Sequence, residues 1–156
     1  MFPENFLTLD RINPTSGAGS KKRILEEIGT LLASALPGLS SEQVFDKLLE
    51  RERLGSTGLG QGIALPHARI EGVENACGAL IRLQSGVDFD AIDNQQVDII
   101  FGLMVPQQAT EEHLQLLAQL ATLFSNEEFC AQLRKNEGSK SILELIHKYQ
   151  GLAKSA

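Results

Sequence analysis

The spacing of apolar residues in the first third of the chain indicates two amphipathic helices. Apolar residues recur every three or four positions over 20–36, which places them on one face of a helix with Ser20 as its N-cap. Ser40 is followed three residues later by a glutamine, the spacing of a capping box, and opens the second helix. A Pro-Gly pair at 37–38 separates the helices, and the glycine-containing segment 13–19 is predicted to be a loop.

The pattern changes in the middle of the chain, where short apolar segments replace the helical spacing. Glycine occupies four of the eight positions in 55–62, so this segment is predicted to be a shaped loop. Segments 62–65 and 76–83 have the length and apolar content of strands. Segment 97–105 is nearly all apolar, which is typical of a strand covered on both faces.

Three further helices are predicted after this strand, with Thr110, Asn126 and Ser139 as their N-caps. Each predicted helix has apolar residues on one face and polar residues on the other. Helices on both sides of a sheet with a doubly covered strand imply an α/β fold, a three-layer α/β/α sandwich.

Composition and charge narrow the classes of protein to which the chain belongs. The 156 residues are 42% hydrophobic and 22% charged, which suits one globular domain. The formal net charge of −6 argues against nucleic acid as the main partner, because phosphate backbones attract clustered cations. The one basic cluster, at 21–23, lies at the start of a predicted helix, where positive charge is unfavourable.

Three features predict a cytoplasmic protein with no direct membrane insertion. No apolar run approaches the roughly 20 residues that cross a bilayer, and the first residues lack the pattern of a signal peptide. Cys77 and Cys130 lie in apolar-rich segments without metal-ligand or redox spacing. We expect both to be reduced, buried thiols.

His67 is the first candidate for chemistry, because it follows Pro66 at the end of a predicted strand and a glycine-rich loop. Glycines such as Gly58 let backbone amides approach an anion closely, and the hydroxyls of Ser56 and Thr57 add donors. These three residues are therefore candidates for binding phosphate. The loop matches neither the P-loop nor the dinucleotide fingerprint, and an ordinary histidine in a turn stays an open alternative.

Two further residues could assist such a site. His113 falls in the first turn of a predicted helix, beside free backbone N–H groups and the positive end of the helix dipole. Arg51 lies at the end of the second helix, where it could reach a phosphoryl group by paired hydrogen bonds. Ordinary helix-end composition would also explain both, and His147 is predicted to be structural or solvated.

Taken together, these residues resemble the active-site signature of the fructose/mannitol-type enzyme IIA domains of the bacterial phosphotransferase system. The signature is carried by 51–69, with its Gly-Ser-Thr-Gly and Ala-Leu-Pro-His-Ala sequences. Segments 20–23 and 89–95, and Pro106 with His113 seven residues later, resemble the nitrogen-related branch. Several motifs in the right order make the resemblance more specific than any one of them.

The resemblance implies a central mixed β-sheet between helices, in a single domain over 6–150 with short tails at 1–5 and 151–156. The sequence departs from the family pattern at two places. Residues 68–69 are Ala-Arg, whereas relatives often have Gly-Lys, and residue 72 is a glycine, Gly72. Because these positions follow His67, we expect them to affect partner contacts more than chemistry.

The same resemblance implies a phosphotransferase that works through a phosphohistidine. In this family the residue matching His67 accepts a phosphoryl group on its tele nitrogen (Nε2) from an HPr-like phosphocarrier protein (NPr). The residues matching His113 and Arg51 assist, and the family needs no cofactor or metal. The nitrogen-related branch acts on target proteins, such as transporters or sensor kinases. Because the sequence has no IIB-like or membrane-spanning segment, we expect regulation and not sugar transport.

Two other hypotheses remain open from the sequence. The first is a regulatory binding module of the same fold whose histidines do not transfer phosphate, since fold alone does not decide function. The second is a metal site made by His67 and His113 with Glu111 or Glu112. No local ligand spacing supports the second.

Overall fold

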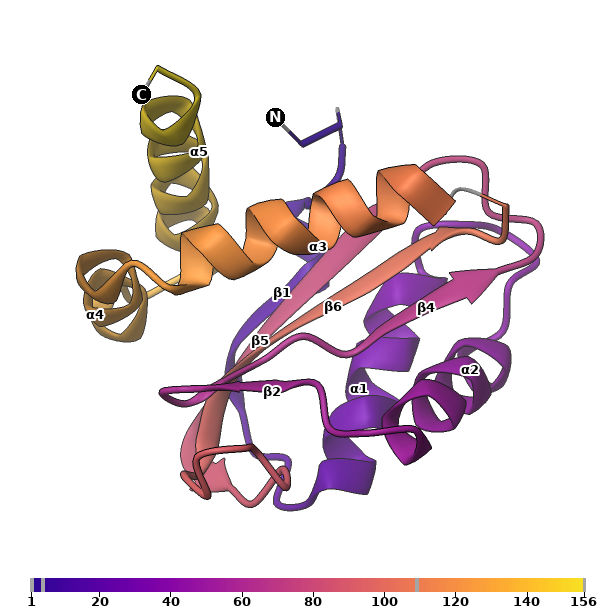
Figure 1. Cartoon of the computed structure of the whole chain (residues 1–156), viewed down its shortest axis with the longest axis horizontal. Helices are drawn as coiled ribbons and strands as arrows, with labels where there is room; N and C mark the ends of the chain where they lie inside the picture. Colours follow the sequence, from indigo (N-terminus) through magenta and orange to yellow (C-terminus); the bar gives the residue numbers. More distant parts are fainter. Residues whose placement is uncertain (1, 4, 109, 156) are drawn as a thin grey trace.

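The computed structural model describes residues 2–3, 5–108 and 110–155, and the side chains of these except 110 and 151–155 (Figure 1). The sheet contains strands β1 (Ile12–Ser16), β2 (Gly58–Gly60), β3 (Ile63–Ala64), β4 (His67–Ile70), β5 (Cys77–Val87) and β6 (Val97–Pro106). A 3₁₀ turn, η1 (Leu9–Arg11), precedes β1. The helices are α1 (Lys21–Ala33), α2 (Ser41–Arg53), α3 (Thr110–Phe124), α4 (Glu127–Lys135) and α5 (Ser139–Ser155).

The sheet is mixed and has the strand order β1-β5-β6-β3-β2. β6 is antiparallel to β5 and parallel to both β3 and β4, which pair with successive parts of it. The backbone N–H of Leu103, where the pairing of β6 with β4 begins, donates to the carbonyl of Pro66 at 3.0 Å. The chain therefore runs along one edge of β6 from β3 to β4, and the proline lies where the strand is interrupted.

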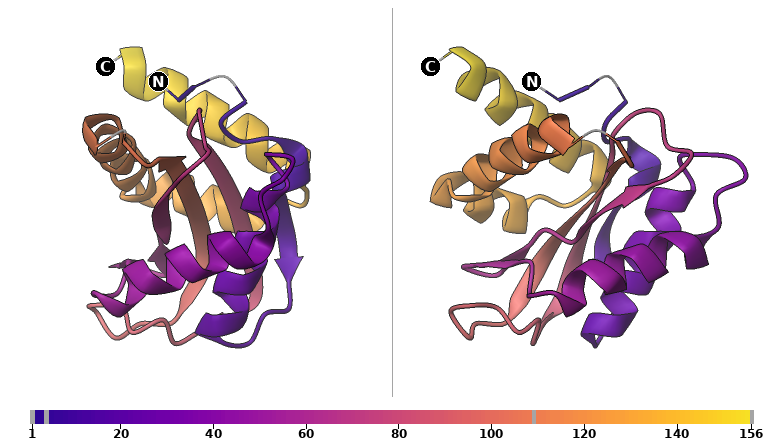
Figure 2. Two further views of the ribbon diagram at one scale, coloured as in Figure 1. Left: turned by 90° about the vertical axis from the view of Figure 1, so that its right-hand side faces the viewer. Right: turned by 45° about the vertical axis from the view of Figure 1, so that its right-hand side comes forward.

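The helices cover both faces of the sheet, so the predicted three-layer α/β/α architecture is confirmed (Figures 1 and 2). α1 and α2 pack on one face, with Ile24, Ile28 and Val44 in their core. α3, α4 and α5 pack on the other, with Leu120 and Phe129 among their buried residues. β6 supplies side chains to both cores, which explains why its sequence is almost wholly apolar.

Most predicted helix starts are confirmed by their side-chain hydrogen bonds. Ser20 accepts from the N–H of Arg23, Ser40 forms the capping box, and Asn126 accepts from the N–H of Phe129. The predicted cap at Ser139 is wrong: it is the first residue of α5, and its hydroxyl donates to the Ile12 carbonyl at 3.2 Å. The predicted cap by the side chain of Thr110 lies outside the described residues.

Two segments that were predicted to be loops contain strands. Residues 12–16 form β1, although 13–19 was predicted to be a loop, because β5 offers them a parallel edge for pairing. Residues 58–60 form the short strand β2 within the predicted loop 55–62. The first helix also ends at Ala33, earlier than the predicted residue 36.

The prediction that Cys77 and Cys130 are reduced, buried thiols is confirmed in part. Both cysteines are free thiols, and Cys130 is buried as predicted, whereas Cys77 is only partly buried at the start of β5. Burial raises the pKa of both thiols.

None of the helices, over the residues that the structure describes, is long and apolar enough to cross a membrane.

Candidate functional site

His67 is the first residue of β4, directly after the interruption at Pro66. Its imidazole Nδ1 lies 2.8 Å from the backbone carbonyl oxygen of Leu65. Because a carbonyl oxygen can only accept a hydrogen bond, Nδ1 carries the proton and Nε2 carries the free lone pair. The local backbone thus selects the tautomer in which Nε2 is the nucleophilic atom.

His113, from the first turn of α3, lies beside His67. The centroids of the two rings are 5.1 Å apart and their planes are nearly perpendicular, at 82°. The His113 Nε2 atom is buried and has no hydrogen-bond partner among the described residues. A buried polar atom of this kind needs an explanation, and a ligand held between the two rings would supply one.

Both imidazoles are neutral near pH 7 in these surroundings. Burial lowers the pKa of His113 to about 4, and the charges of Arg69 and Arg51, together with that of His67 when it is protonated, act in the same direction. Burial also lowers the pKa of His67, although the hydrogen bond to Leu65 and the charge of Glu52 oppose the shift. A neutral imidazole at His67 is the form that can attack an electrophile.

Arg51 completes the group from the end of α2. Its guanidinium donates to the carbonyl of Gly55 at 2.9 Å, which leaves further N–H groups of its planar fork for other partners. Arg51, His67 and His113 line one cleft of about 580 Å³. The structure therefore brings together the three residues predicted to be catalytic, from α2, β4 and α3.

The cleft also contains a cation that sequence reasoning did not assign to the site. Arg69 lies two residues after His67 in β4 and lines the same cleft. Alternate residues of a strand share a face, so the spacing alone would have placed Arg69 beside His67 if β4 had been recognised. The rim of the cleft includes two exposed apolar side chains, Leu54 (83% exposed) and Leu114 (66% exposed).

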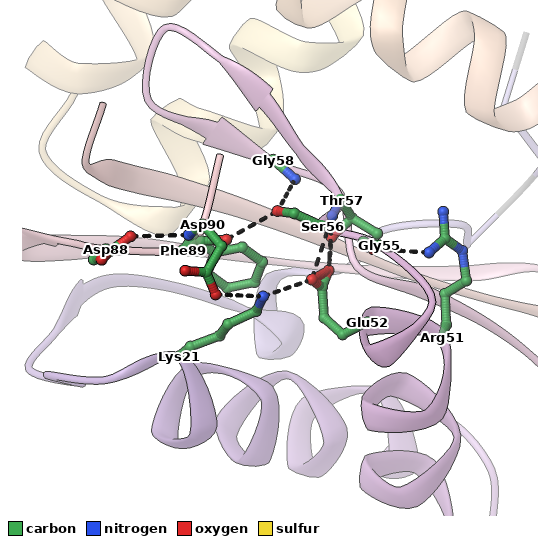
Figure 3. Close-up of polar contacts among 10 residues, drawn as sticks. All are labelled: Lys21, Arg51, Glu52, Gly55, Ser56, Thr57, Gly58, Asp88, Phe89 and Asp90. Carbon is green, nitrogen blue, oxygen red and sulfur yellow. Dashed lines mark hydrogen bonds and ion pairs between the residues drawn. The ribbon is translucent and has the colours of Figure 1, made fainter. Parts of the chain in front are cut away.

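The three predicted phosphate-binding residues do not line this cleft. Figure 3 shows the hydrogen bonds that they make instead. The Ser56 hydroxyl donates to the carbonyl of Phe89 at 2.9 Å and accepts from the N–H of Gly58 at 3.1 Å. Thr57 donates through both its N–H and its hydroxyl to the carboxylate of Glu52. These donors are already engaged, which favours a structural part over direct contact with a phosphoryl group.

Two other sequence expectations concern places outside the cleft. A larger cavity of about 860 Å³ lies between the N-terminal segment and α5, and His147 is among its lining residues. Its lining is mainly apolar and lacks the paired histidines, so we place the chemistry in the smaller cleft. Within the described residues no three His, Cys, Asp or Glu side chains lie close enough to hold a metal ion, and neither Glu111 nor Glu112 lines the cleft.

Comparison with known proteins identifies the family. Residues 5–149 match the family described as "Phosphoenolpyruvate-dependent sugar phosphotransferase system, EIIA 2". The chain belongs to this family. Family membership means that phosphoryl transfer between proteins is its general activity, and it confirms the resemblance seen in the sequence.

Individual members of the enzyme IIA family are similar over most of their length. The "Nitrogen regulatory protein" of Pseudomonas aeruginosa is 41% identical over 143 residues, which cover 92% of this chain and 93% of that protein. The crystal structure of "Nitrogen Regulatory Protein IIA-Ntr" from Neisseria meningitidis has a TM-score of 0.85 at 44% identity, over 90% of this chain and 95% of the other. These relatives confirm the predicted likeness to the nitrogen-related branch.

A third enzyme IIA is similar in fold. The mannitol enzyme IIA of Escherichia coli, solved in a complex with phosphorylated enzyme IIB, has a TM-score of 0.76 at 22% identity. The match covers 91% of this chain and 97% of that one. The mixed sheet between two helical layers is thus common to the sugar-specific and nitrogen-related enzymes IIA.

Proposed function

We propose that this enzyme IIA accepts a phosphoryl group on Nε2 of His67 from an HPr-like phosphocarrier protein (NPr). One observation carries the proposal: the Leu65 carbonyl holds Nδ1 of His67 as the donor, and Nε2 of His113, beside the same ring, has no partner among the residues that the structure describes. This arrangement gives one histidine a nucleophilic nitrogen and gives the other a free polar atom next to it.

The transfer step conserves the phosphoryl group. The lone pair on Nε2 of His67 forms a bond to the phosphorus of the donor's phosphohistidine. The donor's P–N bond breaks, and its electron pair returns to the donor imidazole. No proton leaves His67 in this step, because Nδ1–H stays in the hydrogen bond to Leu65. The His67 ring becomes an N-phosphorylated imidazolium, and the donor ring, protonated on its other nitrogen, leaves as a neutral imidazole.

The remaining residues of the cleft would stabilise the transferring group. The transition state spreads negative charge over three equatorial oxygens, so fixed donors and cations contribute more than further covalent chemistry. Arg51 supplies a planar guanidinium, and His113 supplies an uncharged imidazole with an unpaired nitrogen. Arg69 adds a second cation on the His67 side of the cleft.

The exposed rim of the cleft suits a protein donor. Leu54 and Leu114 project at its edge, and apolar side chains around a reactive group are typical of the centre of a protein interface. The phosphoryl state of His67 would then regulate target proteins, such as transporters or sensor kinases. This part of the proposal is supported by relatives named as nitrogen regulatory proteins.

The deciding experiment is incubation with phosphoenolpyruvate, enzyme I and the phosphocarrier, followed by mass spectrometry without acid. Wild-type protein should gain one phosphoryl group, and His67→Ala should gain none while it keeps its circular dichroism spectrum. An acid-labile adduct on His67→Ala would place the acceptor elsewhere. Wild-type protein that gains no phosphoryl group would instead favour the regulatory binding module.

A further inference from the structure

The basic residue that opens α1 is held by acidic groups from two other segments. Lys21 Nζ lies 3.0 Å from Oε2 of Glu52, at the end of α2, and 3.4 Å from Oδ2 of Asp90 (Figure 3). It also lies 4.8 Å from the centroid of the Phe89 ring. These contacts compensate for its unfavourable place at a helix N-terminus and account for a basic position that the sequence left unexplained.

Glu52 is the centre of this arrangement. Its side chain is only 2% exposed, and an unpaired carboxylate at such a site would be strongly destabilising. Besides Lys21, it accepts from the backbone N–H of Thr57 at 2.9 Å and from the Thr57 hydroxyl. We call Lys21, Glu52, Thr57, Phe89 and Asp90 the Lys21 network.

The Lys21 network fixes the loop between α2 and β2. The backbone N–H of Thr57 donates a hydrogen bond to Glu52, and the hydroxyl of the adjacent Ser56 donates one to the Phe89 carbonyl. Gly58 packs so closely on Ala91 that a Cβ atom at Gly58 would lie 2.8 Å from the Ala91 Cβ. The loop is thereby held to α2 and to the segment that follows β5, and Lys21 of α1 pairs with both of these.

The fixed loop in turn orients the arginine of the cleft. Arg51 and Glu52 are consecutive in α2 and leave the helix in directions about 100° apart. Arg51 donates to the carbonyl of Gly55, only two residues before Thr57, while Glu52 holds the loop from its other side. In Figure 3 the guanidinium of Arg51 lies to the right of the loop, beside Gly55, and Lys21 and Asp90 lie to its left.

We propose that Glu52, held by Lys21, is a positioning residue for phosphoryl transfer: it fixes the loop 55–58 so that Arg51 is kept beside His67. The inference rests on the function proposed above. It also assigns one role to three sequence motifs of the family, at 20–23, 51–69 and 89–95, since each supplies part of the Lys21 network.

Glu52 also acts on His67 through its charge. The charged and titratable groups around His67 come from three elements: Lys47, Glu50, Arg51 and Glu52 from α2, Arg69 from β4, and His113 from α3. Among them, the positive charge of Arg51 lowers the pKa of His67, and the negative charge of Glu52 raises it. Removal of the Glu52 charge should therefore move the titration of His67 to lower pH.

The test compares Glu52→Gln, Lys21→Met and Lys21→Arg with the control Asp98→Asn. The control removes another short ion pair, Arg134–Asp98 at 2.9 Å, which is partly exposed and joins α4 to β6 outside the cleft. NMR titration of the His67 ring in unphosphorylated protein, and single-turnover transfer from the phosphorylated HPr-like carrier, are measured for each variant. The titration does not require that the protein accept phosphate, so it separates this inference from the proposed function.

Glu52→Gln should lower the pKa of His67 and slow transfer about tenfold or more, because small misplacements of catalytic groups are costly. The affinity for the carrier should stay within about twofold of wild type, because the network lies outside the exposed rim. Lys21→Met should slow transfer, Lys21→Arg should restore most of the rate, and Asp98→Asn should match wild type.

Wild-type titration and rates in folded Glu52→Gln would overturn the inference. If that variant does not fold, the Lys21 pair decides: equal rates for Lys21→Met and wild type would also overturn it. If Asp98→Asn slows transfer as much as Glu52→Gln does, general destabilisation explains both variants. That result would count against a positioning role for Glu52. Wild-type protein that fails to accept phosphate, together with a shifted His67 titration in Glu52→Gln, would remove the proposed function but keep the Glu52–His67 coupling.

Discussion

His67 and His113 are neighbours with different hydrogen bonding, and that difference separates their chemistry. Nδ1 of His67 is bonded to the Leu65 carbonyl, so Nε2 is its reactive atom. Nε2 of His113 is buried and has no hydrogen-bond partner in the part of the chain that the structure describes, so His113 can contribute a hydrogen bond to a group bound between the rings. The first histidine is therefore suited to bond formation and the second to stabilising charge.

His113→Ala should fold normally but accept phosphate slowly, because it removes one preorganised donor. The loss of such a donor typically lowers the rate about 10²–10³-fold. Single-turnover transfer from the phosphorylated carrier measures the effect. His147→Ala is the matched control, because His147 is an exposed residue of α5 that does not line the cleft. Near wild-type rates in His113→Ala would mean that His113 takes no part in transfer and is an ordinary residue of the helix start.

The low pKa of His113 predicts a pH-dependent stability. Its pKa is about 4 in the folded protein and about 6.5 in an unfolded chain. Between these values the unfolded state binds a proton that the folded state does not, so stability falls as the pH drops. His113→Gln should lose less stability than wild type between about pH 6.5 and about pH 4, by on the order of 1–2 kcal/mol after allowance for solvent screening.

Urea unfolding of wild type and His113→Gln at several pH values measures this difference. Groups that do not interact with residue 113 contribute equally to both proteins, so the difference between the curves reports His113 together with its coupling to His67. Parallel stability curves for the two proteins would contradict the low pKa of His113.

Sequence reasoning singled out His67, His113 and Arg51 as candidates because of local signals: His67 follows a proline, His113 lies at a helix start and Arg51 at a helix end. Their roles were implied by the family resemblance. It could not place Ser56 and Thr57, because their partners, Phe89 and Glu52, are set by tertiary contacts. A free hydroxyl and an engaged one look alike in a sequence. The assignment of these donors therefore depends on the packing of the whole loop.

At the scale of elements, the approach of α1 to β6 depends on a glycine. Gly102 lies in β6 where the Ile28 side chain of α1 comes down on the sheet, and a Cβ atom at Gly102 would fall on Cγ2 of Ile28. Ile28 is fully buried. Because both residues lie inside a close-packed core, neither can move away freely, and the absence of a side chain at 102 sets the distance between the two elements.

Gly102→Ala should therefore destabilise the protein by about 1–3 kcal/mol, the usual cost of overpacking a core. Urea unfolding measures it. Gly19→Ala is the matched control, because a Cβ atom at Gly19 would meet nothing within 4 Å. The double mutant Gly102→Ala/Ile28→Ala should be more stable than the sum of the single effects predicts. Strict additivity would mean that Gly102 and Ile28 do not interact.

The elements that sequence reasoning missed are those that depend on a partner strand. β1 contains Asn13 and Pro14, poor strand formers, and forms because it can pair in parallel with β5. β4 has only four residues and pairs with β6 over Leu103–Pro106. The long apolar strand and the capped helices were predictable from local pattern, whereas these short strands take their structure from their neighbours.

At the scale of the molecule, charge is distributed unevenly. The chain has a formal net charge of −6, yet Lys47, Arg51 and Arg69 surround His67 in the cleft with Glu50 as the exposed acidic neighbour. A phosphoryl group on His67 would add roughly −1.5 to −2 charges at this point, by analogy with other phosphorylated side chains. The modification would thus reverse much of the local positive charge without a change of fold.

A change of charge at the centre of an exposed rim should change which proteins bind there, because like charges across an interface are strongly disfavoured. We therefore expect target proteins to distinguish the two states of His67, in keeping with the regulatory names of the relatives. Unphosphorylated protein, phosphorylated protein and His67→Ala carried through the phosphorylation mixture are used as baits in cell extract, with quantitative mass spectrometry of the captured proteins. His67→Ala should capture the same set as unphosphorylated protein, and the phosphorylated bait should lose or gain specific members. If all three baits capture the same proteins equally, and a strain without the gene fails to take up one particular sugar, the protein serves sugar transport and the regulatory interpretation is wrong.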